Sequence, residues 1–166
     1  MCSSSFHTIL LAGVLVWCLL IALPPMILTA GASYTPIADV LYKCFSPICH
    51  QDDVRSLHIA GGKLAVCSRC TAIYAGFLIG VFFCRFRHRR IALHPLAVWG
   101  IAMAPMIVDV FLDATGLLSS TLSTRLLSGG FFGTITAVIL TPIIIQACLE
   151  LTRPHSQGVA HVPEAR

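Results

Sequence analysis

Four long apolar runs, separated by short polar segments, dominate the pattern of residues along this chain. They cover about residues 9–30, 64–84, 91–112 and 126–149. Each is close to the roughly 20 residues that a helix needs to cross the hydrocarbon core of a bilayer. The pattern therefore predicts an all-α membrane protein, a bundle of four transmembrane helices that forms a single domain over residues 1–152.

The first apolar run and the polar C-terminal segment each allow a specific prediction. The run at 9–30 also resembles a cleaved signal peptide, because Ala30-Gly31-Ala32 is a small-residue site. However, no Lys or Arg precedes it, and it is longer than the ~7–15 residues of a signal core. We expect a retained helix, with cleavage as the alternative. The polar segment 153–166 is predicted to be a disordered tail.

Small residues within the apolar runs suggest where helices approach each other. Proline and glycine are tolerated in membrane helices because neighbouring groups satisfy the freed backbone. Gly76 with Gly80, and Gly129 with Gly133, form two small-xxx-small pairs. Such pairs are common by chance in apolar segments, so they indicate a close helix contact only weakly.

One short connection sets the predicted orientation. The segment Arg85-Phe86-Arg87-His88-Arg89-Arg90 holds four arginines and no acid, which favours the cytoplasmic side. Both termini are then cytoplasmic, and the protein is expected in the inner or plasma membrane. The segments 31–63 and 113–125 lie on the outer face.

Composition agrees with this picture and excludes several classes of protein. Of the 166 residues, 57% are hydrophobic and 11% are charged, and the mean hydropathy is +0.86. Soluble domains carry about a quarter charged residues, so a soluble fold, a disordered chain and a nucleic-acid-binding domain are excluded. The expected partners are the lipid bilayer and other membrane-protein subunits. No Gly-rich nucleotide loop, Ser/His/Asp set or pair of glutamates supports kinase or hydrolase chemistry.

Four of the eight cysteines lie within 27 residues and form the candidate site. With one histidine they make the pattern C-x4-C-H-x16-C-x2-C, which comprises Cys44, Cys49, His50, Cys67 and Cys70. The C-x2-C element is expected near the start of the second helix, where residues three apart share a face. The helix N-terminus stabilises a thiolate, and a thiolate either ligates a metal or attacks a disulfide.

Three interpretations of the cluster remain open. The favoured one is a zinc or iron site formed by Cys49, His50, Cys67 and Cys70, with Cys44 as a substitute for His50. Adjacent side chains diverge, which counts against Cys49 and His50 binding one ion. The second is a thiol–disulfide oxidoreductase using Cys67 and Cys70, similar in architecture to quinone-coupled disulfide-forming enzymes. The third is a static disulfide staple, and a non-enzymatic subunit of a membrane complex is a further possibility, so enzyme activity stays undecided.

Charged residues are expected near the outer ends of the helices. Asp109 and Asp113 are four positions apart and share a helix face. Because an isolated carboxylate in hydrocarbon is costly, we expect Asp109 to pair with Arg125 or Arg69 and so to support the site. The alternative is that Asp109 accepts a proton or holds His50 in place.

Two blocks of sequence resemble a known family. The first contains Cys49-His50-Gln51, Arg55-Ser56, Gly61-Gly62 and the stretch from Cys67-Ser68-Arg69-Cys70 to Phe77. The second contains Pro105-Met106-Ile107-Val108-Asp109, Gly116 and Arg125-Leu126-Leu127-Ser128-Gly129. They are similar to the predicted membrane proteins catalogued as domain of unknown function 2085, over roughly residues 44–140. The resemblance implies a membrane protein and brings no established activity.

Overall fold

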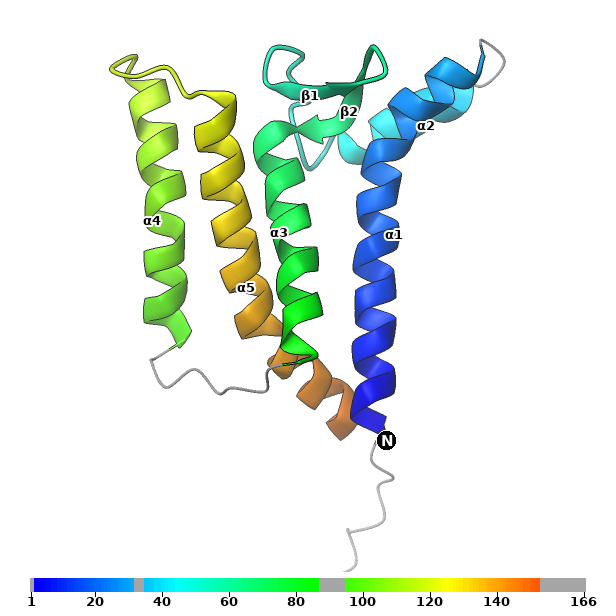
Figure 1. The fold of residues 1–166 in the computed structure, drawn as a ribbon, viewed down its shortest axis with the longest axis vertical. Coiled ribbons are helices and arrows are strands. Elements are labelled where there is room, and N and C mark those ends of the chain that lie inside the picture. Colours follow the sequence, from blue (N-terminus) through cyan, green and yellow to red (C-terminus); the bar gives the residue numbers. More distant parts are fainter. Residues whose placement is uncertain (1, 32–34, 87–94, 153–166) are drawn as a thin grey trace, which may run out of the picture.

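The computed structural model describes residues 2–31, 35–86 and 95–152 and is mostly helical (Figure 1). Its elements, in order, are α1 (Cys2–Ala30), α2 (Thr35–Phe45), β1 (Ser56–Ile59), β2 (Gly62–Cys67), α3 (Ser68–Cys84), α4 (Pro95–Ala114) and α5 (Leu122–Leu151). The four longer helices run alongside one another, with α2 and the strands at one end. The start of α1 and the end of α5 lie at the opposite end. Residues 87–94 of the basic connection and the predicted tail at 153–166 lie outside the described residues.

Within the described residues, three helices are long and apolar enough to cross a membrane. The spans are Ser4–Thr29, Leu96–Ala114 and Leu122–Leu151. The helix α3 has 17 residues and is therefore about 25 Å long, somewhat less than the ~30 Å hydrocarbon core. The length and composition of the helices thus support three spans, and a four-span bundle is not confirmed.

Residues 64–67 form a strand rather than the first turn of the second predicted helix. Ala60 and Gly61 both have positive φ, 52° and 83°, which is the requirement of a two-residue type I′ hairpin turn. Around this turn Ile59 pairs with Gly62 in an antiparallel ladder. The all-α prediction is therefore wrong for the hairpin, and α3 begins at Ser68, four residues later than expected.

The helix α2 was also not predicted, since residues 31–63 were expected to be a loop. It has 11 residues, and Ala38 and Phe45 on one side of it are buried. The helix packs against α1 and β2. The charged side chains of Asp39 and Lys43 are exposed. The segment is amphipathic and short, so it lacks the long apolar run that marks the other helices.

The helices α3 and α5 are the most extensively packed pair, and glycine lets their backbones touch. A Cβ on Gly129 would lie 2.7 Å from the carbonyl oxygen of Arg69, and one on Gly76 or Gly133 would collide with the facing backbone. The Thr134 hydroxyl donates to the Gly76 carbonyl at 3.1 Å. The glycine pairs noted in the sequence therefore lie in this interface.

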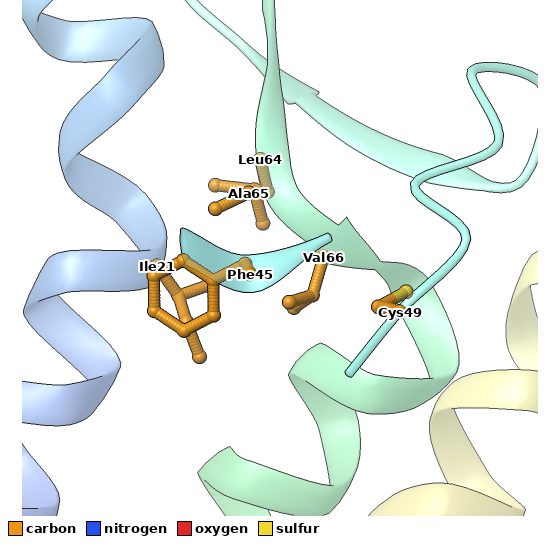
Figure 2. Packing of buried hydrophobic residues seen from close by; sticks show 6 residues of the cluster. All are labelled: Ile21, Phe45, Cys49, Leu64, Ala65 and Val66. Carbon is orange, nitrogen blue, oxygen red and sulfur yellow. The ribbon is translucent and has the colours of Figure 1, made fainter. Parts of the chain in front are cut away.

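A small hydrophobic core joins α1, α2 and β2 at the end of the molecule where the strands lie (Figure 2). Its buried members are Ile21, Phe45, Cys49, Leu64, Ala65 and Val66. Trp17 packs edge-on against Phe45 and Tyr74, with ring centroids 5.1 Å and 6.0 Å apart. This core supports the loop that carries Cys49 and fixes it beside the start of α3.

Candidate metal and thiol site

Three cysteines converge at the end of the bundle where the hairpin lies. The sulfur atoms of Cys49, Cys67 and Cys70 all lie within 4.8 Å of one another, and all three are free thiols. Cys49 is buried, whereas Cys67 and Cys70 are partly buried. One sulfur comes from the loop after α2, and two come from the junction of β2 and α3. These segments are far apart in sequence, so the tertiary structure creates the cluster.

The junction of β2 and α3 explains how Cys67 and Cys70 meet. Cys67 ends the strand and is the N-cap of α3, with extended φ and ψ of −66° and 162°. Cys70 stands at the third helical position. Side chains at the N-cap and at the third helical position face each other, as in a capping box. The C-x2-C spacing therefore brings both sulfurs together wherever a strand runs directly into a helix.

Cys49 is held to this junction through its own sulfur and its own backbone. The backbone N–H of Cys67 donates to Cys49 Sγ, with an N···S distance of 3.2 Å. The backbone N–H of Cys49 donates to the carbonyl of Phe45 at 3.1 Å. These two bonds fix the Cys49 sulfur beside the start of α3.

The environment of Cys67 stabilises its thiolate. The thiol of Cys70 donates to the Cys67 sulfur, and this is the largest influence that lowers the pKa of Cys67 to about 5. Burial acts in the opposite direction, while the peptide N–H groups of Arg69 and Cys70 and the thiol of Cys49 also lower the pKa. Cys67 is therefore ionised at neutral pH and is ready to bind a cation or to act as a nucleophile.

Two other sequence-predicted ligands stand apart from this group. His50 follows Cys49 directly but its side chain is exposed, and it is not among the donors that converge within 4.8 Å. Cys44 is exposed on α2 and is not among them either. The adjacency of Cys49 and His50 gives the physical reason, because neighbouring side chains in a loop point in different directions. The role of His50 as a ligand stays a prediction.

A network of charged and hydroxyl groups lies beside the cysteines. Arg69, between Cys67 and Cys70 in sequence, forms an ion pair with Asp109 of α4. The Ser120 hydroxyl donates to Asp109 Oδ1 at 2.9 Å and accepts from Arg125 Nε at 3.0 Å. The network therefore joins the start of α3 to α4 and α5.

Asp113 forms ion pairs with two other arginines beside this network. Its carboxylate lies 3.7 Å from Arg125 Nη2 and 3.6 Å from Arg55 Nη1. Of the two expected partners of Asp109, Arg69 pairs with it, whereas Arg125 pairs with Asp113. Ser120 was not singled out from the sequence. From the sequence it is one polar residue of the outer segment 113–125, six positions before the predicted start of the last helix at residue 126.

Replacing Asp109 with asparagine is expected to destabilise the protein by about 3 kcal/mol, since breaking a buried ion pair leaves an uncompensated charge. The side chains of Arg69 and Asp109 are 20% and 11% exposed. The exposed Asp52–Arg55 pair offers a matched control, and D52N should change stability by less than about 1 kcal/mol. Unfolding in mixed micelles measures both variants. Equal effects of D109N and D52N would contradict this assignment.

Comparison with known proteins agrees with the features described so far. The model of a family described as predicted membrane protein, domain of unknown function 2085, matches residues 49–139. An uncharacterized protein of Methanocaldococcus jannaschii is 32% identical over 146 residues, which cover 85% of this chain and 94% of that protein. No solved structure matches the chain. The match begins at Cys49, includes all three converging cysteines, and reaches into α5, so this chain belongs to the domain of unknown function 2085 family of predicted membrane proteins.

Proposed function

We propose that this membrane protein binds one metal ion, zinc or iron, through Cys49, Cys67 and Cys70. The observation that carries the proposal is the convergence of three sulfur donors within 4.8 Å of one another. In tetrahedral coordination two sulfurs lie about 3.8 Å apart, because each Zn–S bond is about 2.3 Å long. The three thiols therefore need to move by no more than about an ångström to ligate one ion.

The chemistry of the donors also favours a metal. One of the three sulfurs, that of Cys67, has a pKa of about 5, and ligation requires thiolates. Three thiolates with one divalent cation leave a net charge of −1, which is easier to bury than three separate charges. Soft sulfur donors favour zinc or iron over magnesium or calcium.

The fourth coordination position is open in this proposal, and His50 is the candidate for it. A rotation of the exposed imidazole toward the sulfurs would complete a Cys3His set, which is common in structural zinc sites. If H50A keeps the metal with unchanged affinity, the fourth ligand is a water or another molecule rather than this histidine.

Elemental analysis of the purified protein, combined with thiol counting before and after reduction, tests the proposal. We expect about one zinc or iron per chain, and we expect the metal to protect three thiols from alkylation until a chelator removes it. A metal-free protein that binds neither Zn²⁺ nor Co²⁺ when reduced would overturn the proposal.

Thiol–disulfide exchange is the second candidate, and the lowered pKa of Cys67 favours it. A C-x2-C pair at a helix N-terminus with an ionised first cysteine is the arrangement of disulfide oxidoreductases. In this case Cys67 and Cys70 would pass two electrons and two protons to a membrane quinone as their disulfide forms, and a substrate dithiol would reduce that disulfide again. Their reduction potential would lie in the range of catalytic pairs. A pair that stays reduced under oxidants, or oxidised under strong thiols, would exclude this candidate.

We infer further that α3 is a fourth span and that the cysteines face the outside of an inner or plasma membrane. The packing of α3 along α5 and the arginine-rich connection after α3 support this placement. Labelling with a membrane-impermeant maleimide in intact cells tests it through Cys44, which is exposed beside the site. Labelling of Cys44 only after cell lysis would reverse the orientation.

A further inference from the structure

We infer that Gln51 positions Cys49 for metal binding and that its side-chain amide performs this role. The inference rests on the proposed metal site and adds a residue to it that is not itself a ligand. Gln51 follows His50 in the first of the two sequence blocks described above. In the structure it lies two residues from Cys49, and its side chain joins α2 to β2.

The amide group of Gln51 bridges two elements. Its Nε2 donates to the carbonyl of Tyr42 at 2.7 Å and to the carbonyl of Ala65 at 2.8 Å. An amide nitrogen has two hydrogens, and both are used. Tyr42 lies in the last turn of α2 and Ala65 in the middle of β2, so one side chain of the Cys49 loop ties α2 to β2.

The backbone of Gln51 shows that this position is specified by its surroundings. Its φ is +53°, a left-handed conformation that costs a residue other than glycine roughly 1–2 kcal/mol. Such strain persists only when neighbouring interactions determine it. The Lys63 ammonium donates to the Gln51 carbonyl at 3.2 Å, and the Tyr42 hydroxyl donates to the Lys63 carbonyl at 2.5 Å. These bonds connect Gln51, Tyr42 and Lys63 in a closed network.

The three sulfurs depend on this network to different degrees. Cys67 and Cys70 are placed by the junction of β2 and α3, which does not involve Gln51. Cys49 lies in the loop between α2 and β1, and the Gln51 amide fastens this loop to both α2 and β2. The Lys63 ammonium and the Cys67 N–H add one bond each from β2 to the loop. Loss of the amide should therefore release one sulfur of the three and leave the other two in place.

The test compares Q51E and Q51G with the unmodified protein. Q51E keeps the size of the side chain but replaces the donating amide with a carboxylate that would repel both carbonyls. Q51G removes the amide while relieving the backbone strain. Q146A is the control for loss of an amide, since Gln146 is exposed on α5 and bonds only Glu150 among the described residues.

Binding of Co²⁺ and sulfur counting by X-ray absorption are the measurements. We expect three sulfur ligands in the unmodified protein and in Q146A, and two in Q51E and Q51G. We also expect an affinity loss of about 10–100-fold, as for other groups that orient a ligand. Three sulfurs and unchanged affinity in both Gln51 variants would overturn the inference.

A readout without metal separates this inference from the metal proposal. In the metal-free, reduced protein Cys49 is buried, so it should react with maleimide more slowly than Cys67. In Q51E and Q51G the rate at Cys49 should rise several-fold while the rates at Cys67 and Cys70 stay unchanged. A protein that binds no metal but shows this selective rise refutes the metal proposal alone. Equal acceleration at all three cysteines means general unfolding and refutes the positioning role.

Discussion

Serine in place of Cys49, Cys67 or Cys70 is expected to reduce the metal content from about one ion per chain to below a tenth. Removal of one ligand from a three-sulfur site leaves two sulfur donors. Two donors hold the ion much more weakly than three. The metal content of each variant, purified from cells grown with and without added zinc, provides the measurement. The three variants should behave alike, because the three sulfurs converge on one point.

The chain offers two matched controls for the cysteine variants. Cys44 is exposed near the site and Cys148 lies in α5, and neither belongs to the converging group. The variants C44S and C148S should keep the metal. If C67S and C70S lose a reducible disulfide while C49S does not, the oxidoreductase candidate replaces the metal site. If the three variants only lower the amount of protein in the membrane, the cysteines have a structural role, as expected of a non-enzymatic subunit.

Alanine at Gly76 or Gly133 is expected to destabilise the protein by about 2–3 kcal/mol. The added Cβ would collide with backbone atoms of the facing helix. In G76A it would meet the backbone of Gly130, and in G133A it would meet the carbonyl of Ile73. A rigid backbone cannot yield as a flexible side chain can, so α3 and α5 would have to separate. Separation also weakens the hydrogen bond from Thr134 to the Gly76 carbonyl.

Two glycines elsewhere provide controls for this prediction. A Cβ on Gly13 of α1 or on Gly100 of α4 meets no atom within 4 Å, so G13A and G100A should leave stability unchanged or raise it slightly, given the higher helix propensity of alanine. Unfolding in mixed micelles compares the four variants. A similar loss in G13A and G133A would show that glycine acts through general flexibility and not through the α3–α5 contact.

The α3–α5 contact and the cysteine site are parts of one structure. Gly129 of α5 lies against the carbonyl of Arg69, and Arg69 stands between the two cysteines of the C-x2-C element. The same arginine pairs with Asp109 of α4. We therefore expect G133A to weaken metal binding as well as stability, by a smaller factor than the cysteine variants, because the first turn of α3 moves with the rest of the helix.

Membrane character and the main helices were predictable from the sequence because they depend on local composition. Runs of about 20 apolar residues correspond to the helices α1, α4 and α5, since only a helix satisfies its own backbone in an apolar medium. The convergence of Cys67 and Cys70 was also predictable, because residues three apart at the start of a helix lie side by side, whether the first is inside the helix or at its N-cap. In these cases residues within one turn or one segment carry the information.

The hairpin and α2 were missed for the opposite reason. Leu64, Ala65 and Val66 are apolar and adjacent, and a run this short fits a buried strand as well as a helix. Their burial against α1 and α2, together with the left-handed turn at Ala60 and Gly61, favours the strand. The helix α2 is stabilised by one buried face, and the partner of that face is distant in sequence.

The set of residues that form the cysteine site shows which contacts can be predicted from spacing along the chain and which cannot. The pattern of cysteines named Cys49, Cys67 and Cys70 as donors and placed the last two together, but it left open whether His50 or Cys44 joins them and could not show that Cys49 reaches the pair. That contact depends on how a loop is folded back by Gln51, Tyr42 and Ala65. Spacing fixes contacts within a helical turn, whereas a contact between distant segments exists only after the tertiary packing has oriented both.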